Sequence, residues 1–162
     1  MVAGAAGRWQ EQLKQLLFDA LNTMRRHPGI ARFALGRIPT KENGLAMTEA
    51  MLGLLDAGRV PEQYAAWAVD MLGLFVAGAA YEEAVELAEG QTEENMQEWF
   101  DQLGIYFSSL PTQQYPHLVR MAPFMVQGGG DQRLEFALDI MINGLAATAG
   151  GAAPAAATAL PR

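Results

Sequence analysis

The apolar positions between Pro61 and Glu89 have the most unusual pattern in this sequence. No proline follows Pro61 within the segment, so the segment predicts one long helix. At about 100° per residue, the helix has two apolar sides. One side carries Trp67, Met71, Leu74, Gly78, Tyr81 and Val85, and the other carries Val69, Leu72, Val76 and Leu87. A seam of small residues lies between them and is interrupted by Asp70: Ala66, Gly73, Ala77, Ala84 and Ala88. A helix that is apolar on several sides must be buried on several sides. We therefore expect it to pack against its own domain on one side and against a second copy of the chain on another.

Helical periodicity continues through nearly all of the remaining chain, and strand-like alternation between turn residues is absent. Helices are predicted over residues 8–26, 30–35, 40–57, 61–89, 91–110, 117–127 and 131–147. We expect Gly58 to act as the C-cap of the helix before it, and Thr92 to cap the helix after it. The last helix is apolar on two sides, with Leu134, Leu138, Met141 and Leu145 on one and Phe136, Ile140 and Ala147 on the other.

These patterns predict an all-α fold with one domain. The predicted organisation is a leader at residues 1–7, a helical domain at residues 8–147, and a disordered tail rich in alanine, glycine and proline at residues 148–162.

Composition narrows the functional classes. The 162 residues carry 11 basic against 18 acidic side chains and a formal net charge of −7, which argues against nucleic-acid binding by this chain as it stands. The absence of cysteine excludes disulfides and thiol catalysis and suits a reducing cytoplasm. The start of the sequence lacks the apolar core of a signal peptide. The most apolar run, residues 65–80, contains Asp70 and is short for a membrane span, so a buried helix is favoured.

The order and spacing of several short segments resemble the C-terminal domain of tetracycline-repressor-type (TetR) transcription regulators. The matching segments are Trp9-Gln10-Glu11-Gln12-Leu13, Arg26-His27-Pro28-Gly29, Gly36-Arg37-Ile38-Pro39-Thr40, Leu55-Asp56-Ala57-Gly58, Leu74-Phe75-Val76-Ala77-Gly78, and Arg133-Leu134-Glu135-Phe136-Ala137-Leu138-Asp139-Ile140 with Gly144-Leu145. The resemblance covers roughly residues 8–147. It implies a helical domain that binds a small, mostly hydrophobic ligand and dimerises through a four-helix bundle formed by the long helix, the last helix and their twofold mates.

The resemblance is incomplete because no segment before Trp9 is long enough to hold the helix-turn-helix of that family. The chain as given is therefore not expected to bind an operator. Two interpretations stay open: the ligand-binding half of a regulator, or a free-standing protein that sequesters the ligand. A structural dimerisation module without a ligand is a third interpretation, and an enzyme on the same scaffold is a fourth.

Candidate binding residues follow from methionine and aromatic positions, because these side chains adapt to flat apolar ligands. The candidate ligand-binding set is Met24, Phe33, Met47, Met51, Trp67, Met71 and Phe75. For any one of these residues, packing in an ordinary core is the simpler interpretation. The candidate dimer-interface set is Gly73, Ala77, Ala84, Leu138, Met141 and Leu145, which combines the small seam with one side of the last helix.

The sequence has few other side chains that suggest metal binding or catalysis. His27 and His117 lie far apart, without metal-ligand partners at helical or loop spacing, so no metal or cofactor is expected. No nucleophile and base recur at a recognised spacing, so an enzyme is not expected. Asp70 could contact a polar ligand group, or it could pair across the dimer seam with an arginine such as Arg120 or Arg133.

Overall fold

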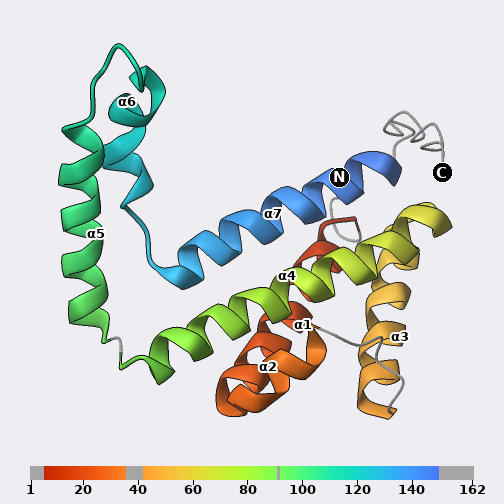
Figure 1. The fold of residues 1–162 in the computed structure, drawn as a ribbon. Coiled ribbons are helices and arrows are strands. Elements are labelled where there is room, and N and C mark those ends of the chain that lie inside the picture. Colours follow the sequence, from red (N-terminus) through yellow and green to blue (C-terminus); the bar gives the residue numbers. More distant parts are fainter. Residues whose placement is uncertain (1–5, 36–41, 91, 150–162) are drawn as a thin grey trace, which may run out of the picture. The chain divides into compact units, whose positions relative to one another are not determined.

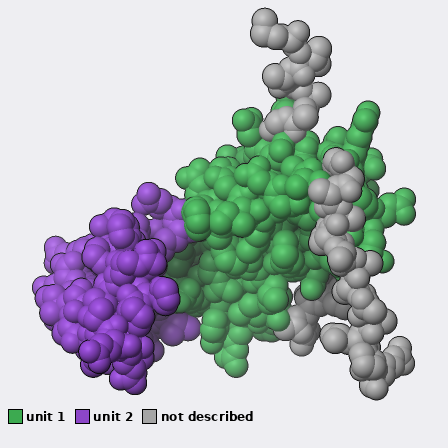
Figure 2. All heavy atoms as spheres, turned by 90° about the horizontal axis from the view of Figure 1, so that it is seen from above, with its two compact units in different colours: residues 1–83, 134–162 green, residues 84–133 purple. Residues whose placement is uncertain are grey.

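The computed structural model describes residues 6–35, 42–90 and 92–149. Its seven helices in that part of the chain are α1 (Ala6–Arg26), α2 (Pro28–Ala34), α3 (Glu42–Ala57), α4 (Glu62–Ala88), α5 (Glu93–Ser108), α6 (Pro116–Met125) and α7 (Gly130–Ala149), and the described residues contain no strand (Figure 1). The all-α prediction is therefore confirmed. The chain forms two compact units, unit 1 with residues 1–83 and 134–162 and unit 2 with residues 84–133 (Figure 2).

Two predicted boundaries differ from the structure. Helix α1 begins at Ala6, inside the predicted leader, and α7 continues to Ala149, past the predicted start of the tail at residue 148. Thr148 is buried, because it lies three residues after the buried Leu145 on the same face of the helix, and its hydroxyl donates to the Leu145 carbonyl at 2.6 Å. The remainder of the predicted tail and leader, and the segment Gly36-Arg37-Ile38-Pro39-Thr40, lie outside the described residues.

The core of unit 1 is built around α1. Trp9, Leu13, Leu17 and Leu21 recur every four residues, so they share one face of the helix, and all four are buried. Burial of each leucine contributes about 1.5–3 kcal/mol relative to an exposed position. The same core cluster takes in Ala31 from α2, Met51 and Leu55 from α3, Ala65, Ala68, Leu72, Val76 and Ala80 from α4, and Leu134, Leu138, Ile142 and Leu145 from α7.

Ion pairs on α1 add polar contacts to α7 and α4. Lys14 Nζ lies 2.6 Å from Asp139 Oδ1 and 3.1 Å from Glu135 Oε1 on α7. The hydrogen bond to Asp139 raises the pKa of Lys14 above its ordinary value of 10.5, and burial of the side chain opposes the rise. Because the pKa is raised, this contribution to stability is complete below pH 10.5 and is lost only as the pH rises through the higher value. Near the other end of α1, Arg25 binds Glu83 of α4 through two hydrogen bonds of 2.7 Å.

The long helix α4 is buried on one side only. Its buried side chains are Ala65, Ala68, Leu72, Val76, Ala77 and Ala80, which confirms that one side packs against its own domain. With 27 residues it is longer than the apolar run identified in the sequence, and by length and composition alone it could cross a membrane. In the protomer, however, this helix supplies core residues of unit 1.

Gly58 directly follows the last residue of α3, which agrees with the predicted C-cap. The left-handed residue is Arg59, with φ of 56°, and not Gly58. The Val60 amide donates to the Leu55 carbonyl at 3.0 Å and the Arg59 amide donates to the Asp56 carbonyl at 2.8 Å, which is a Schellman motif. The buried side chains of Val60 and Leu55 supply the hydrophobic pair that accompanies this motif. Gly58 has another role, because a Cβ there would lie 2.5 Å from the Trp9 indole.

The close approach of Trp9 to Gly58 makes a stability prediction. We expect Gly58→Ala to lower the free energy of unfolding by about 1–3 kcal/mol, because the added methyl group overlaps a buried aromatic ring. Arg59→Gly in the same turn is the matched comparison. It should raise stability by about 1 kcal/mol or less, because glycine adopts a positive φ without strain. Urea denaturation of both variants checks this. Equal stability of Gly58→Ala and the parent protein would show that the indole can move aside.

Unit 2 consists mainly of α5 and α6. Thr92 caps α5 as predicted, with its hydroxyl accepting a hydrogen bond from the Asn95 amide at 3.2 Å. The guanidinium of Arg133 donates to the carbonyls of Met125, Gln127 and Gly128 at distances of 2.6–3.1 Å and lies over the Phe100 ring. Among the described residues of this unit, only Ala122 is fully buried. Arg133, one of the arginines considered as a partner for Asp70, is thus engaged within unit 2, and Asp70 is exposed.

Candidate ligand-binding site

An open groove lies between α1 and α3 in unit 1. Helix α1 lines it with Gln12, Gln15, Leu16 and Asp19, and α3 lines it with Ala50, Gly53 and Leu54. Its volume is about 510 Å³, which falls within the range of small-molecule sites, about 300–1,000 Å³. Five of its seven lining residues, Gln12, Gln15, Asp19, Ala50 and Gly53, are exposed, so the groove is wide open to solvent.

The spacing of residues on each helix explains the shape of the groove. Gln12, Gln15 and Asp19 are three and four residues apart, so they line up along one side of α1, and Leu16 lies beside them. On α3, Ala50 and Gly53 are also three residues apart, and their small size leaves the helix backbone accessible. A Cβ added to Gly53 would meet no atom within 4 Å. One apolar side chain, Leu54, and two small residues on α3 therefore lie opposite the polar row and Leu16 on α1.

Hydrogen bonding fixes the orientation of the polar row. Gln15 Nε2 donates to Asp19 Oδ1 at 2.9 Å. A carboxylate only accepts hydrogen bonds, so the amide nitrogen of Gln15 must face Asp19 and its carbonyl oxygen must point elsewhere. Lys14, although between these residues in sequence, turns to another side of α1, where it binds Glu135 and Asp139. Asp19 is the one charged side chain among the described residues that line the groove.

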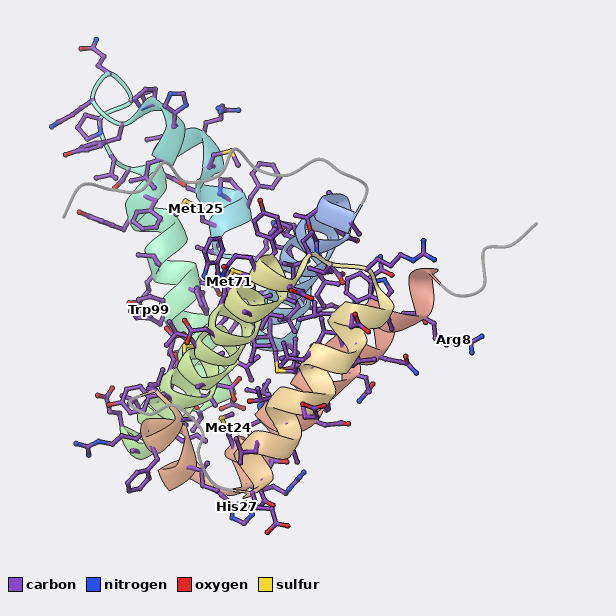
Figure 3. The ribbon with its side chains drawn as sticks, turned by 90° about the vertical axis from the view of Figure 1, so that its right-hand side faces the viewer. Arg8, Met24, His27, Met71, Trp99 and Met125 are labelled. Atoms are coloured by element: carbon purple, nitrogen blue, oxygen red, sulfur yellow. The ribbon has the colours of Figure 1, made fainter. Side chains whose placement is uncertain are left out.

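The seven predicted ligand-binding residues differ in their burial within the described part of the protomer. Met51 is a core residue, while Met24, Met47 and Phe75 are half-buried and pack against the core. Phe33, Trp67 and Met71 are 66 %, 57 % and 41 % exposed. Figure 3 shows Met24 near the end of α1, close to His27, and Met71 on α4. The role of these seven residues in ligand binding therefore stays a prediction.

The predicted ligand-binding residues are large apolar side chains, whereas the groove is lined mainly by small and polar residues. Met47 and Met51 are one turn from Ala50 and Leu54 on the same helix, so the prediction reached α3 but chose the neighbouring positions. The sequence feature that could have indicated the groove is the pair of small residues Ala50 and Gly53, three residues apart on one helix. Gly53 lies inside this helix, where no turn requires a glycine.

The predicted dimer-interface residues differ in their burial within the single protomer. Ala77, Leu138 and Leu145 are 1 %, 0 % and 9 % exposed, so in this protomer their side chains face the core. Met141 and Ala84 are half-buried and Gly73 is exposed. The predicted set therefore combines core-facing positions with positions that solvent reaches in the protomer.

Apolar surface is exposed on other sides of these two helices. Helix α4 exposes Trp67, Met71, Leu74 and Tyr81, and α7 exposes Phe136 and Ile140. Both groups match stripes identified in the sequence. On α7, however, the exposed stripe is opposite to the stripe that was predicted to form the dimer interface. Tyr64 and Trp67 stack edge to face with ring centres 6.0 Å apart. These exposed side chains are the apolar surface available to a partner.

Acidic, serine and histidine side chains are the remaining groups that could support other chemistry in the described part of the chain. No cluster of three histidine, aspartate or glutamate side chains that could hold a metal ion occurs among the described residues. The hydroxyls of Ser108 and Ser109 donate to the carbonyls of Gly104 and Tyr106 at 2.7 Å, which satisfies acceptors at the end of α5. His27 and His117 are both exposed.

Comparison with known proteins gives consistent matches. The family described as "Tetracyclin repressor-like, C-terminal domain" matches residues 3–149. The crystal structure of apo ActR from Streptomyces coelicolor is 33 % identical, with a TM-score of 0.74, and the match covers 89 % of this chain and 66 % of that one. ActR in complex with actinorhodin is 33 % identical with a TM-score of 0.76 over the same shares of the two chains. The transcriptional regulator SCO7222, a TetR from Streptomyces coelicolor, is 19 % identical, with a TM-score of 0.73. This match covers 90 % of this chain and 68 % of that one, and at this identity it supports the fold alone.

The chain spans about two thirds of the length of these solved relatives, 66 % for both ActR structures. No curated protein matches it.

Proposed function

Because this chain belongs to the tetracycline-repressor family and carries its C-terminal domain over residues 3–149, we propose that it is the ligand-binding and homodimerising part of a TetR-type transcription regulator. The ligand is a small, mostly hydrophobic organic molecule. The observation that carries this proposal is the open groove between α1 and α3, which lies within a domain whose 33 % identical relative ActR has been crystallised with actinorhodin and with (S)-DNPA.

The groove supports ligand binding by its composition. Leu16 and Leu54 provide apolar contact, Ala50 and Gly53 allow a flat molecule to approach α3, and the polar row on α1 orients it. This combination of apolar walls and a few polar groups is typical of small-molecule sites. Met47, which is half-buried and three residues before Ala50 on α3, is the member of the predicted set best placed to adjust to a molecule in the groove.

The homodimer is proposed on the exposed apolar surface of α4 and α7. Soluble monomers seldom expose large contiguous apolar patches, and symmetric dimers bury such surface against its own copy. Trp67, Met71, Leu74 and Tyr81 on α4, together with Phe136 and Ile140 on α7, are the proposed interface. Trp67 and Met71 then belong to the dimer surface, and the four-helix bundle proposed for the family is formed with these sides of the helices facing inward.

Within a complete regulator, a ligand that binds one arrangement of the helices more tightly shifts the population toward it. DNA recognition is not proposed for this chain, whose net charge is −7. A regulator of this kind works in the cytoplasm, which is the proposed location. The alternative functions are sequestration of the ligand by a free-standing protein and a structural dimerisation module that binds no ligand.

Blocking the groove tests the ligand site. Gly53→Leu places a larger side chain in open space on α3, so the fold should be retained and should gain slightly in stability from the better helix propensity of leucine. We expect actinorhodin to raise the melting temperature of the parent protein and to leave that of the variant unchanged. Gly144→Ala, an exposed glycine of α7, is the control and should keep the ligand shift.

Two results would contradict the proposal. An equal ligand-induced shift in Gly53→Leu and the parent protein would place the ligand elsewhere. The absence of any shift in the parent protein would favour the structural dimerisation module.

A further inference from the structure

Helices α5 and α6 pack against each other with little fully buried surface. Five apolar side chains of this pair are only half-buried: Phe100, Leu103, Phe107, Leu118 and Val126. Gly104 permits the close approach of the two helices, because a Cβ there would lie 3.3 Å from Val126 Cγ2 (Figure 1). Helix α1, in contrast, buries three leucines to 1 % exposure or less. The hydrophobic stabilisation of α5 and α6 is therefore much smaller than that of unit 1.

Two glycines with a left-handed backbone lie at the borders of this pair of helices. Gly90, with φ of 76°, follows α4, and Gly128, with φ of 86°, follows α6. Glycine adopts a positive φ without the steric cost that other residues have there. Pro123 inside α6 has no amide hydrogen, so this helix also lacks one of its own hydrogen bonds. Small residues at the ends of helices are common hinge positions, and both borders have one.

One side chain closes this segment at its C-terminal border. The Arg133 guanidinium donates hydrogen bonds to the carbonyl oxygens of Met125 at 2.6 Å, Gln127 at 2.9 Å and Gly128 at 3.1 Å. Its central carbon lies 5.2 Å from the centre of the Phe100 ring on α5. Arg133 itself is near the start of α7. It therefore joins the end of α6, the side of α5 that carries Phe100 and the beginning of α7.

The chemistry of arginine suits this position. The last carbonyl groups of a helix have no partner within the helix, and the helix dipole favours a cation beside them. A guanidinium has five donors in a rigid plane, so it can serve three carbonyls and stack on an aromatic ring at the same time. In a unit with so little buried apolar surface, these contacts are a large share of what holds the two helices closed.

We propose that α5 and α6 open as a separate segment of the folded domain, with Gly90 and Gly128 as hinges, and that Arg133 is the clasp whose release opens it. Opening breaks the hydrogen bonds of Arg133 and separates α5 from α6, while the core around α1 stays folded. The domain then has a second state, which a ligand or a partner can stabilise or suppress. The inference does not use the groove between α1 and α3, so it is independent of the proposed ligand site.

Native-state hydrogen exchange, measured by mass spectrometry, compares the helices within one intact chain. The exchange rate of a protected amide, relative to its intrinsic rate, follows the population of its open state. We expect amides inside α5 and α6 to exchange at least about hundredfold faster than those inside α1, because each buried leucine of α1 contributes a factor of roughly ten or more. The protein concentration is one at which the oligomeric state is known, because contact with a second copy also slows exchange.

Removal of the clasp provides the second arm. We expect Arg133→Gln to accelerate exchange in α5 and α6 by a further factor of about ten and to leave exchange in α1 unchanged. A hydrogen bond to a charged group can contribute this factor alone, but Arg133 is exposed, so water replaces part of its contacts. Arg133→Lys keeps the charge without the planar donors, so it should accelerate exchange in the same two helices to a smaller extent.

Arg120→Gln is the matched control. It makes the same change in net charge at an exposed position of α6, and Arg120 has no hydrogen bond or ion pair to another described residue. Exchange in all helices should therefore stay at the rates of the parent protein.

Equal exchange in α1, α5 and α6 of the parent protein would show that they unfold only together, and would exclude the separate opening. If Arg133→Gln and Arg120→Gln change exchange alike, or if Arg133→Gln accelerates α1 as much as α5, Arg133 is not the clasp. Should Arg133→Gln fail to fold, Arg133→Lys decides: acceleration confined to α5 and α6 supports the clasp, and its absence excludes it. Gly53→Leu tests the ligand site separately, so failure of one proposal is distinguishable from failure of the other.

Discussion

A single charge on the exposed face of α4 is expected to convert the dimer into monomers. Leu74 is exposed in the protomer, between Met71 and Tyr81 on the apolar side of the helix. In a symmetric dimer this surface meets its own copy, so Leu74→Glu places two carboxylates in one apolar interface. A buried, unpaired charge costs several kcal/mol. A loss of about 3 kcal/mol corresponds to a dissociation constant raised roughly hundredfold.

Sedimentation equilibrium over a range of protein concentrations measures this change. The matched control is Leu45→Glu, an exposed leucine of α3 in the same unit, where the same substitution should leave the dimer intact. Circular dichroism should give the same helical signal for both variants, because both leucines face water in the protomer. A dimer of unchanged affinity in Leu74→Glu would exclude this side of α4 as the interface. A parent protein that stays monomeric at high concentration would exclude the homodimer itself.

Leu138→Ala is expected to have the largest effect on protomer stability. This residue is 0 % exposed and lies in the core cluster with α1 side chains. Removing a buried leucine side chain leaves a cavity and costs about 2–5 kcal/mol of unfolding free energy, which is a large share of the stability of a domain of this size, about 5–15 kcal/mol. The measurement is urea denaturation at a protein concentration at which the oligomeric state is known, because dimerisation adds to the apparent stability.

Ile140→Ala on the same helix is the comparison. Ile140 is 57 % exposed, so its truncation removes little contact within the protomer. It should change the unfolding free energy of the protomer by less than about 0.5 kcal/mol while weakening dimerisation. The reverse pattern, a stable Leu138→Ala monomer and an unfolded Ile140→Ala protein, would restore the interface assignment made from the sequence.

The contrast between Leu138 and Ile140 indicates which parts of this fold periodicity can predict. The sequence separates α7 into one stripe with Leu134, Leu138 and Leu145 and another with Phe136 and Ile140, and the structure keeps these groups apart. What the periodicity leaves open is which stripe faces the protomer core. Rotation of a helix about its own axis changes that answer without changing any spacing along the chain.

The turn after α3 also shows that contacts distant in the chain decide the role of a single residue. Glycine at position 58 correctly indicated the end of the helix, because glycine is common where helices end. Its actual role depends on Trp9, which is some fifty residues earlier in the chain and packs against it in the folded domain. The residue with positive φ is Arg59, and local sequence preferences gave no reason to choose an arginine there.

The candidate site shows more clearly than the fold does which features the sequence alone does not predict. Methionines and aromatic residues were chosen because their side chains suit ligands in general, yet Met51 fills the core and Trp67 is exposed. The groove instead depends on what is small, Ala50 and Gly53, and on which polar residues of α1 face it. A pocket is space left between elements, and space is set by how the elements pack.

The amino-acid sequence by itself determined the helices, the cap at Thr92 and the separation of apolar stripes on α4 and α7, because these depend on contacts between residues three or four positions apart. Only the tertiary structure decided that Ala77 and Leu138 face inward, that Trp67 and Ile140 face outward, and that Gln15 and Asp19 border a groove. These outcomes depend on how each helix is rotated and packed against segments distant in the chain, and that choice is made by the total burial of the whole domain, not by any local pattern.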